Sequence, residues 1–147
     1  MNKTTYEEFL EKNGEMTYSN VGVSMLPLLK EGRDLFTITP KGSERCKKYD
    51  VILYNDRRGR YILHRVVEVR EHDYVVLGDN TYSKEYRKDE VILGVMTSFV
   101  HKGKAHSVDE FGYRFYSVVW TAIYPIRKIY KKTRRIVGRT LRKLHLR

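Results

Sequence analysis

The chain has 147 residues, 41% of them hydrophobic and 12% aromatic, a length and composition that predict one folded domain and exclude an intrinsically disordered chain. Its single cysteine, Cys46, excludes an internal disulfide and a thiolate metal cage, and its polar neighbours predict a solvent-side position. The net charge of +11 comes from residues 111–147, which contain eleven Lys and Arg and no Asp or Glu, so a basic segment follows a neutral body.

The N-terminal segment does not resemble a secretory signal peptide. The first 23 residues contain four glutamates and no apolar run, whereas a signal peptide needs an apolar core. Nowhere does the sequence offer the roughly 20 uninterrupted apolar residues that a membrane-spanning helix requires. We therefore expect a protein that is not exported by that route.

A short helix is expected near residues 4–13. Thr5 and Glu8 have the spacing of a capping box, and Gly14 can end the helix in a left-handed conformation. From Met16 the chain changes to short runs rich in Val, Ile, Leu and Tyr, separated by turn-forming residues. These runs predict strands at residues 16–23, 34–39, 50–54, 60–69, 74–77, 91–101 and 104–108.

Strands at this spacing, with no helices between them, favour an antiparallel sheet that coils into a sandwich or small barrel. From Phe111 apolar residues recur at three- and four-residue spacing, and after Pro125 a narrower apolar stripe continues through the basic run. We predict two helical segments with a bend near Pro125. The expected organisation is an N-terminal helix in residues 1–15, a β-domain in residues 16–110 and a basic helical tail in residues 111–147.

The stretch Gly22 to Leu29, GVSMLPLL, places one serine on a constrained turn. Pro27 fixes its own φ and biases Leu26 toward an extended conformation, which argues against a helix interior around Ser24. A serine hydroxyl is a poor nucleophile until a neighbouring base takes its proton. On its local pattern alone the stretch is best interpreted as an ordinary turn at the end of a strand.

Two further stretches could supply the missing partners. His64 lies in a β-forming run, and an imidazole that titrates near neutrality can accept a serine proton and return it to a leaving amine. Taken alone, His64 is better interpreted as a core histidine. Gly78-Asp79-Asn80 is a good turn sequence, and either Asp79 or Glu85 could provide a carboxylate that orients the histidine.

Together, S-M-x-P, then H-R-V within a strand, then G-D-N after the next strand, resemble type I signal peptidases and their relatives in the SOS-repressor peptidase clan. The likeness is to the endoplasmic-reticulum, archaeal and sporulation-type branch, which uses histidine where the common bacterial enzymes use lysine. It covers roughly residues 18–98, including residues 50–52 and 90–95, which look like flanking strands of that fold. The resemblance implies a mainly β fold, with a coiled antiparallel sheet or small barrel of the signal peptidase type.

Carried over by position, the resemblance makes Ser24 the nucleophile and His64 the general base, and it matches Asp79 to the aspartate of the G-D-N motif. Glu85 stands where that branch has a second aspartate, so the identity of the orienting carboxylate stays open. The implied reaction is cleavage of a leader, signal or propeptide through an acyl-enzyme, without cofactor or metal, with the Ser24 N–H holding the oxyanion.

The resemblance also implies that the substrate lies extended, as an added strand beside the serine segment, with small side chains near the cut site. The residues expected to line its binding site are Gly22, Val23, Met25, Leu26 and Pro27.

Signal peptidases usually carry an apolar membrane anchor ahead of the serine, and we expect residues 111–147 to replace it. Five aromatic residues supply amphipathic side chains, and the basic run attracts anionic headgroups. They are Tyr113, Tyr116, Trp120, Tyr124 and Tyr130. We therefore expect a cytoplasmic protein, peripheral on the inner face of the membrane. In the alternative, residues 111–126 pack on the β-body and the basic part is solvated.

Two other functions compete with the peptidase. A β-domain of the same ancestry could hold peptide without cutting it, or the basic, tyrosine-bearing tail could bind nucleic acid. We expect nucleic acid less, because the apolar stripe within the basic run fits a membrane better than a duplex.

Overall fold

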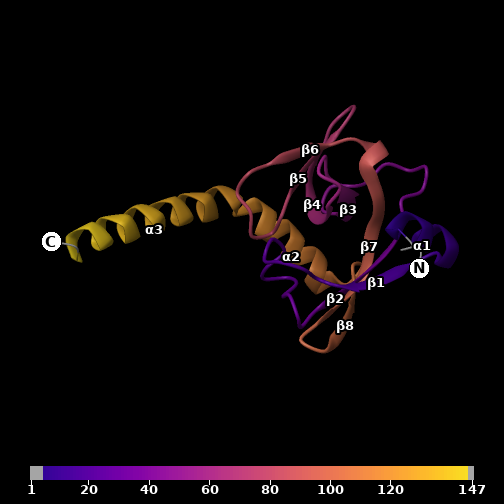
Figure 1. The fold of residues 1–147 in the computed structure, drawn as a ribbon, viewed down its shortest axis with the longest axis horizontal. Coiled ribbons are helices and arrows are strands. Elements are labelled where there is room, and N and C mark those ends of the chain that lie inside the picture. The colour runs from indigo at the N-terminus through magenta and orange to yellow at the C-terminus, as the bar shows by residue number, and fades with distance from the viewer. Residues whose placement is uncertain (1–4, 146–147) are drawn as a thin grey trace.

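The structure, a computed structural model, describes residues 5–145. A β-sheet body carries a short helix near its N-terminus, and two C-terminal helices follow, the second of which extends away from the body (Figure 1). Residue 4, where the predicted first helix begins, and residues 146–147 at the end of the predicted tail lie outside the described residues.

Helix α1 (Tyr6–Asn13) forms where its capping signals predicted. The Thr5 hydroxyl accepts a hydrogen bond from the Glu8 N–H, and the Glu8 carboxylate accepts one from the Thr5 N–H, which completes the capping box. Gly14 ends the helix with φ of 76°. The helix buries Leu10 and packs Tyr6 against the core, whereas Phe9 stays exposed.

The body is one antiparallel sheet of eight strands. Seven were predicted within a few residues, and β6 was missed because three polar and aromatic residues show no alternation. A short 3₁₀ turn (Asp89–Val91) follows β6. The strands are β1 (Met16–Ser19), β2 (Leu35–Pro40), β3 (Val51–Asn55), β4 (Tyr61–Val69), β5 (Tyr74–Leu77), β6 (Glu85–Arg87), β7 (Ile92–His101) and β8 (Lys104–Ser107).

The strand order is β1-β2-β7-β3-β4-β5-β6, with β8 pairing to β7. The register shifts between β2 and β7, between β3 and β7, and between β4 and β5, and such irregularities bend and coil a sheet. The two ends of the order, β1 and β6, do not pair, so the sheet is open. The mainly β prediction is confirmed, and of the coiled sheet or small barrel that the resemblance implied, residues 5–145 form a sheet that does not close.

Two apolar clusters lie on the two faces of the central strands, because successive side chains of a strand point to opposite faces. Val51 and Leu53 join the larger cluster, which also holds Met25 and Leu29 of the serine stretch. The smaller cluster contains Cys46, which is 5% exposed. The prediction that this cysteine lies on the solvent side is therefore wrong: its two neighbours in sequence are exposed, but its own side chain packs in the cluster and its N–H donates to the Tyr74 hydroxyl at 3.1 Å.

The C-terminal helices are α2 (Phe111–Ala122) and α3 (Tyr124–His145). They break at Ile123, two residues before Pro125, close to the predicted bend. Helix α2 packs on the body through Tyr113 and Ser117, whereas α3 buries no residue. Within residues 5–145, no helix combines the length and apolar character needed to cross a membrane.

Candidate active site

Ser24 lies half-buried in the turn of residues 22–28. The buried Asn20 amide donates to the Gly22 and Leu29 carbonyls, at 3.3 and 3.2 Å, which ties the two ends of the stretch together. Met25, beside the serine, is completely buried in the larger apolar cluster. Met25 therefore anchors the turn, and its predicted place in a substrate groove is wrong because the side chain points into the core.

The Gly78-Asp79-Asn80 loop holds the serine turn from the other side. The Asn80 N–H donates to the Ser24 carbonyl at 2.8 Å, and the Asn80 amide donates to the Val23 carbonyl at 3.1 Å. A methyl group on Gly78 would lie 2.7 Å from the Ser24 carbonyl oxygen and 3.0 Å from Cδ2 of His64. Ser24 and His64 thus flank the same glycine, and the three predicted motifs meet at one place.

His64 belongs to a hydrogen-bonded chain that we call the histidine cluster: His64 and Tyr54, which are buried, and the partly exposed Glu85. The Tyr54 hydroxyl donates to a Glu85 carboxylate oxygen at 2.7 Å and lies 3.0 Å from Nδ1 of His64. A hydroxyl has one proton, and because Tyr54 gives it to Glu85, its oxygen accepts from the His64 Nδ1–H. This network assigns the tautomer, and Nε2, which makes no hydrogen bond within residues 5–145, keeps a free lone pair.

The surroundings of His64 shift its pKa in the direction that a general base requires. Burial lowers the pKa of His64, and the nearby Glu85 carboxylate partly opposes this, so the imidazole is neutral at pH 7. Burial and the hydrogen bond to Glu85 raise the pKa of Tyr54, which keeps its bridging proton in place. Arg87 donates to the same Glu85 oxygen at 2.8 Å and fixes the carboxylate.

Asp79 does not contact His64. Both of its carboxylate oxygens accept hydrogen bonds from Arg65, each at 2.8 Å, and Tyr116 donates to one of them at 2.8 Å. The Arg65 and Asp79 side chains are 1% and 2% exposed. Of the two carboxylates that the sequence left open, only Glu85 reaches the histidine, and it does so through Tyr54.

Helix α2 completes this second group, the arginine cluster: Arg65, Asp79, Tyr113, Tyr116 and Ser117. The Arg65 guanidinium donates to the Ser117 hydroxyl at 2.7 Å and to the Tyr113 hydroxyl at 3.2 Å. Burial of Tyr116 beside Asp79 raises the pKa of its hydroxyl, so it stays a donor to the carboxylate. The cluster therefore fastens α2 to the G-D-N loop.

The backbone of the same loop is also held by the C-terminal helices. Trp120 of α2 and Arg127 of α3 both donate to the Asp79 carbonyl, at 2.8 and 2.9 Å. Tyr124 donates to the carbonyl of Tyr82 at 2.7 Å. Four of the five aromatic residues expected to reach a membrane (Tyr113, Tyr116, Trp120 and Tyr124) instead hold the body, as the alternative for residues 111–126 predicted.

A small cavity of about 160 Å³ opens beside Ser24, between β1, β3 and β4. Its walls include Tyr18, Val21, Tyr61 and Leu63, and its volume suits a small apolar side chain. Val21 and Val23 are 71% and 61% exposed. Their backbone N–H groups make no hydrogen bond within residues 5–145, and β1, which leads into them, is an edge strand. An extended peptide could therefore add here.

The other predicted substrate residues occupy different positions. Gly22 has φ of 78° and donates its N–H to the Glu31 carboxylate at 3.0 Å, so its role is to shape the turn. Leu26 and Pro27 lie on the far side of the turn and line a separate cavity with Trp120.

Sequence reasoning missed Tyr54, Arg65 and Asn80. Tyr54 follows three apolar residues in β3 and lies two positions from Ile52, which pairs with His64, so alternation could have placed it on the histidine face. Arg65 is a charge in the middle of a strand, followed directly by two valines, a signal for a buried ion pair. For Asn80, nothing local shows that its amide turns back to the serine stretch.

In the part of the chain that the structure describes, no group of three His, Cys, Asp or Glu side chains could hold a metal ion. Comparisons of this chain with protein-family models, with curated proteins and with solved structures found no match. Any functional conclusion therefore depends on the residues themselves and their geometry.

Proposed function

We propose that the chain is a serine endopeptidase of the signal peptidase type, with Ser24 as nucleophile and His64 as general base. The carrying observation is that Gly78 is flanked by Ser24 and His64, while the histidine cluster leaves Nε2 of His64 as a proton acceptor. The sequence resemblance to the histidine branch of signal peptidases supports the same assignment.

In this mechanism Nε2 takes the Ser24 hydroxyl proton as Oγ attacks the peptide carbonyl, and the resulting imidazolium is stabilised through Tyr54 and Glu85. The Ser24 N–H makes no hydrogen bond within residues 5–145, so it is available to the oxyanion. His64 then returns its proton to the leaving amine, and the acyl-enzyme forms. A water molecule, deprotonated by His64, releases the acyl group and regenerates Ser24.

The substrate in this proposal is a leader, signal or propeptide. It lies extended along Val21 and Val23, and a small side chain next to the cut site enters the cavity beside Ser24. Tyr18, Tyr61 and Leu63 limit that cavity and disfavour a large side chain there.

A fluorophosphonate probe tests the proposal, because it reacts only with an activated serine. We expect labelling of the full chain, loss of labelling in Ser24→Ala and in His64→Ala, and unchanged labelling in Ser19→Ala, which removes another serine from the same cavity. Circular dichroism checks that each variant is folded. Labelling that survives Ser24→Ala, or no labelling across the pH range, would contradict the mechanism.

A second candidate is a domain that holds peptide along the same edge without cutting it. It is favoured by one observation: within residues 5–145, the Ser24 hydroxyl makes no hydrogen bond to the His64 ring. Catalytic hydrogen bonds often tighten only when substrate binds, so the peptidase remains the main proposal. Peptide affinity equal in the full chain and in Ser24→Ala, with neither labelled, would favour the binder.

A further inference from the structure

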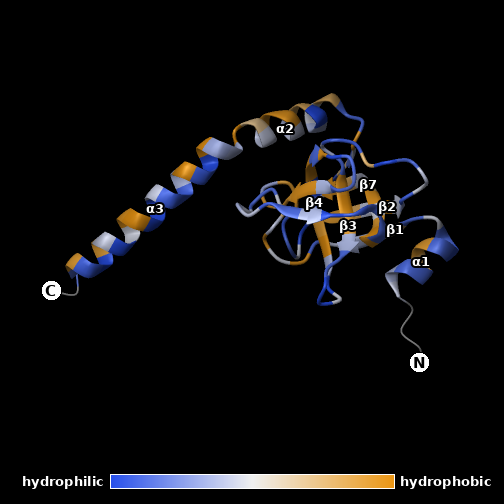
Figure 2. Cartoon of the chain, turned by 90° about the horizontal axis from the view of Figure 1, so that it is seen from above, coloured by the Kyte–Doolittle hydropathy of each residue, from blue (hydrophilic) through white to orange (hydrophobic). Residues whose placement is uncertain are grey.

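Helices α2 and α3 share one exposed apolar stripe. Its residues recur at three- and four-residue spacing, and the Arg127 N–H bonds to the Ile123 carbonyl at 3.0 Å, which carries the spacing across the break. Figure 2 shows the stripe as apolar patches repeating along both helices between polar ones. Its members, between 39% and 82% exposed, are Phe111, Phe115, Val118, Val119, Ile126, Ile129, Tyr130, Ile136, Val137, Leu141 and Leu144.

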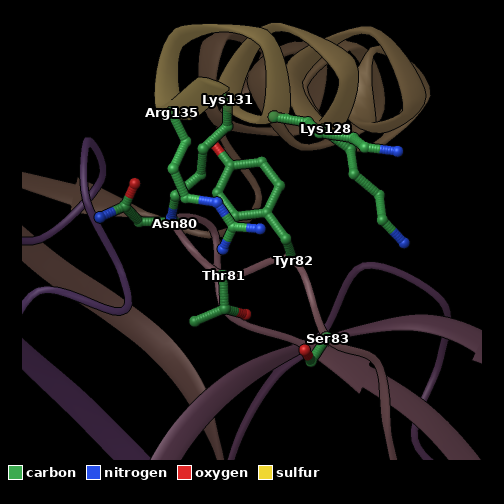
Figure 3. A pocket seen from close by; sticks show the side chains of 8 residues that line it. Asn80, Thr81, Tyr82, Ser83, Lys128, Lys131 and Arg135 are labelled. Carbon is green, nitrogen blue, oxygen red and sulfur yellow. The ribbon is translucent and has the colours of Figure 1, made fainter. Parts of the chain in front are cut away.

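The opposite side of the helices faces the body. On α2 it carries the residues of the arginine cluster, and on α3 it continues as a basic face made of Lys128, Lys131, Lys132 and Arg135. These side chains and the loop of residues 80–83 line a cavity of about 530 Å³ (Figure 3). Lys131 lies 4.2 Å from the centre of the Tyr82 ring. These contacts turn the basic face of α3 toward the loop, and within residues 5–145 only Ile126 and Tyr130 of the apolar stripe, near the start of α3, line a cavity with loop residues.

The charge of α3 indicates which kind of partner covers the apolar stripe. Helix α3 contains nine Lys and Arg and no Asp or Glu, and its 22 residues extend about 33 Å. A basic polar face opposite an apolar face is the pattern of helices that lie in the headgroup region of a membrane. A second copy of the chain would instead bring two strongly basic helices together, at a cost in repulsion.

We propose that the apolar stripe of α2 and α3 docks on an anionic lipid bilayer, with exposed basic side chains of α3 contacting the headgroups. This surface differs from the one expected from the sequence, since most of the expected aromatic residues hold the body. The inference does not depend on catalysis by Ser24, so the two proposals can fail separately.

Docking of the stripe would also bring the serine turn of the candidate active site close to the bilayer. Ile126 and Tyr130 of the stripe line a cavity of about 490 Å³ together with Leu26 and Pro27 of the serine turn. The turn therefore adjoins the lipid-facing edge of the molecule. A peptide emerging from the bilayer surface would pass directly to the segment that holds Ser24.

Vesicle flotation of the full chain tests the docking. The probes are vesicles of phosphatidylcholine alone and vesicles of an equimolar mixture with phosphatidylglycerol. We expect binding to the mixed vesicles and a loss of at least about tenfold in the double variant Ile129→Gln with Val137→Gln, because apolar burial supplies much of the affinity of interfacial helices. A matched control, Val69→Gln with Tyr86→Gln, changes two exposed apolar residues of the sheet and should bind as the parent does.

The outcomes separate the alternatives. Binding that the stripe variant keeps, or equal binding to both vesicles, would overturn the proposal. So would a dimer, seen by sedimentation velocity, that the stripe variant loses while no vesicle binds. Salt-sensitive affinity for DNA or RNA that survives the stripe substitutions, without vesicle binding, would assign the basic face to nucleic acid. Ser24→Ala should bind vesicles normally, which distinguishes failure of docking from failure of the peptidase.

Discussion

His64 and Arg65 are neighbours on β4, yet the two polar clusters they build differ in how fully their groups are paired. In the arginine cluster, Arg65 and Asp79 form a bidentate pair, and three hydroxyl groups of α2 bond to it. In the histidine cluster, Nε2 of His64 keeps a free lone pair because Tyr54 takes the other ring nitrogen. The arginine cluster holds the Gly78-Asp79-Asn80 loop in place, and the histidine cluster leaves Nε2 of His64 available as a proton acceptor.

The difference follows from the strand and from burial. Adjacent positions of a strand face opposite sides of the sheet, so one side chain meets α2 and the other meets β3 and β6. A fully buried charge such as Arg65 must be paired to be tolerated, whereas a neutral imidazole can be buried with one nitrogen unpaired at a smaller cost. We therefore predict that substitutions in the arginine cluster mainly lower the stability of the fold, and that substitutions in the histidine cluster mainly lower the reactivity of Ser24.

The largest expected effect is the loss of stability in Asp79→Asn. This change leaves the buried Arg65 charge without its partner, and breaking a buried pair costs about 3 to 5 kcal/mol. Urea unfolding measures the free energy of unfolding. The matched change in the other cluster, Glu85→Gln, should cost much less because that side chain is 37% exposed. Equal destabilisation by the two variants would contradict the prediction that the arginine cluster contributes more to stability than the histidine cluster.

The next effect is on reactivity, in Tyr54→Phe. Removing this hydroxyl frees the Nδ1 side of His64, so the tautomer with a basic Nε2 is no longer fixed, and we expect probe labelling to slow on the order of a hundredfold. Tyr116→Phe removes a hydroxyl from the arginine cluster and should lower the urea midpoint while labelling of the folded protein changes little. If Tyr116→Phe slows labelling as strongly as Tyr54→Phe does, the two clusters are not separable.

Gly78→Ala changes the glycine that lies between the serine turn and His64 of the histidine cluster and directly precedes Asp79 of the arginine cluster. The added methyl group would press on the Ser24 carbonyl oxygen and on the His64 ring, and overpacking of this kind costs about 1 to 3 kcal/mol. We expect both a lower thermal midpoint and slower labelling. Gly42→Ala is the control, because a methyl group there meets no atom within 4 Å. Unchanged labelling in Gly78→Ala would show that the serine turn does not depend on this packing.

The smallest effect is a shift in pH dependence. Burial lowers the pKa of His64 from its ordinary value of 6.5, and the base works only when neutral, so labelling should fall with pH only below 6.5. The Glu85 carboxylate raises the pKa of His64 and Arg87 lowers it. The acid limb should therefore move to lower pH in Glu85→Gln and to higher pH in Arg87→Gln. Shifts in the reverse directions would contradict the histidine assignment.

The lowered pKa of His64 also affects stability. Below pH 6.5 the unfolded chain binds a proton at this histidine while the folded chain resists it, so stability decreases as the pH falls through that value. Urea unfolding of the parent and of His64→Gln between pH 5 and pH 8 should show a smaller pH dependence in the variant, measured over the range in which histidine normally titrates.

The elements of the fold were largely predictable because their signals are local. The capping box of α1, the alternation in β4 and the apolar spacing of α2 and α3 each lie within a few residues of the structure they specify. The three-residue strand β6 has no such signal, and its pairing with β5 joins residues that lie nine to thirteen positions apart. Whether the sheet closes also depends on distant pairing, so the sequence left a coiled sheet, a sandwich and a small barrel open, and only the structure shows that the sheet is not closed.

The sequence by itself determined which residue types are available for chemistry: Ser24 on a turn, His64 on a strand, two carboxylates and a basic amphipathic tail. Only the tertiary structure decided their partners. It paired Asp79 with Arg65, joined Glu85 to His64 through Tyr54, buried Met25, and turned Tyr113, Tyr116 and Trp120 of α2 toward the body. The physical reason is that a hydrogen bond or a buried contact depends on which face a side chain shares with residues far along the chain, and this is fixed only when the sheet and helices pack.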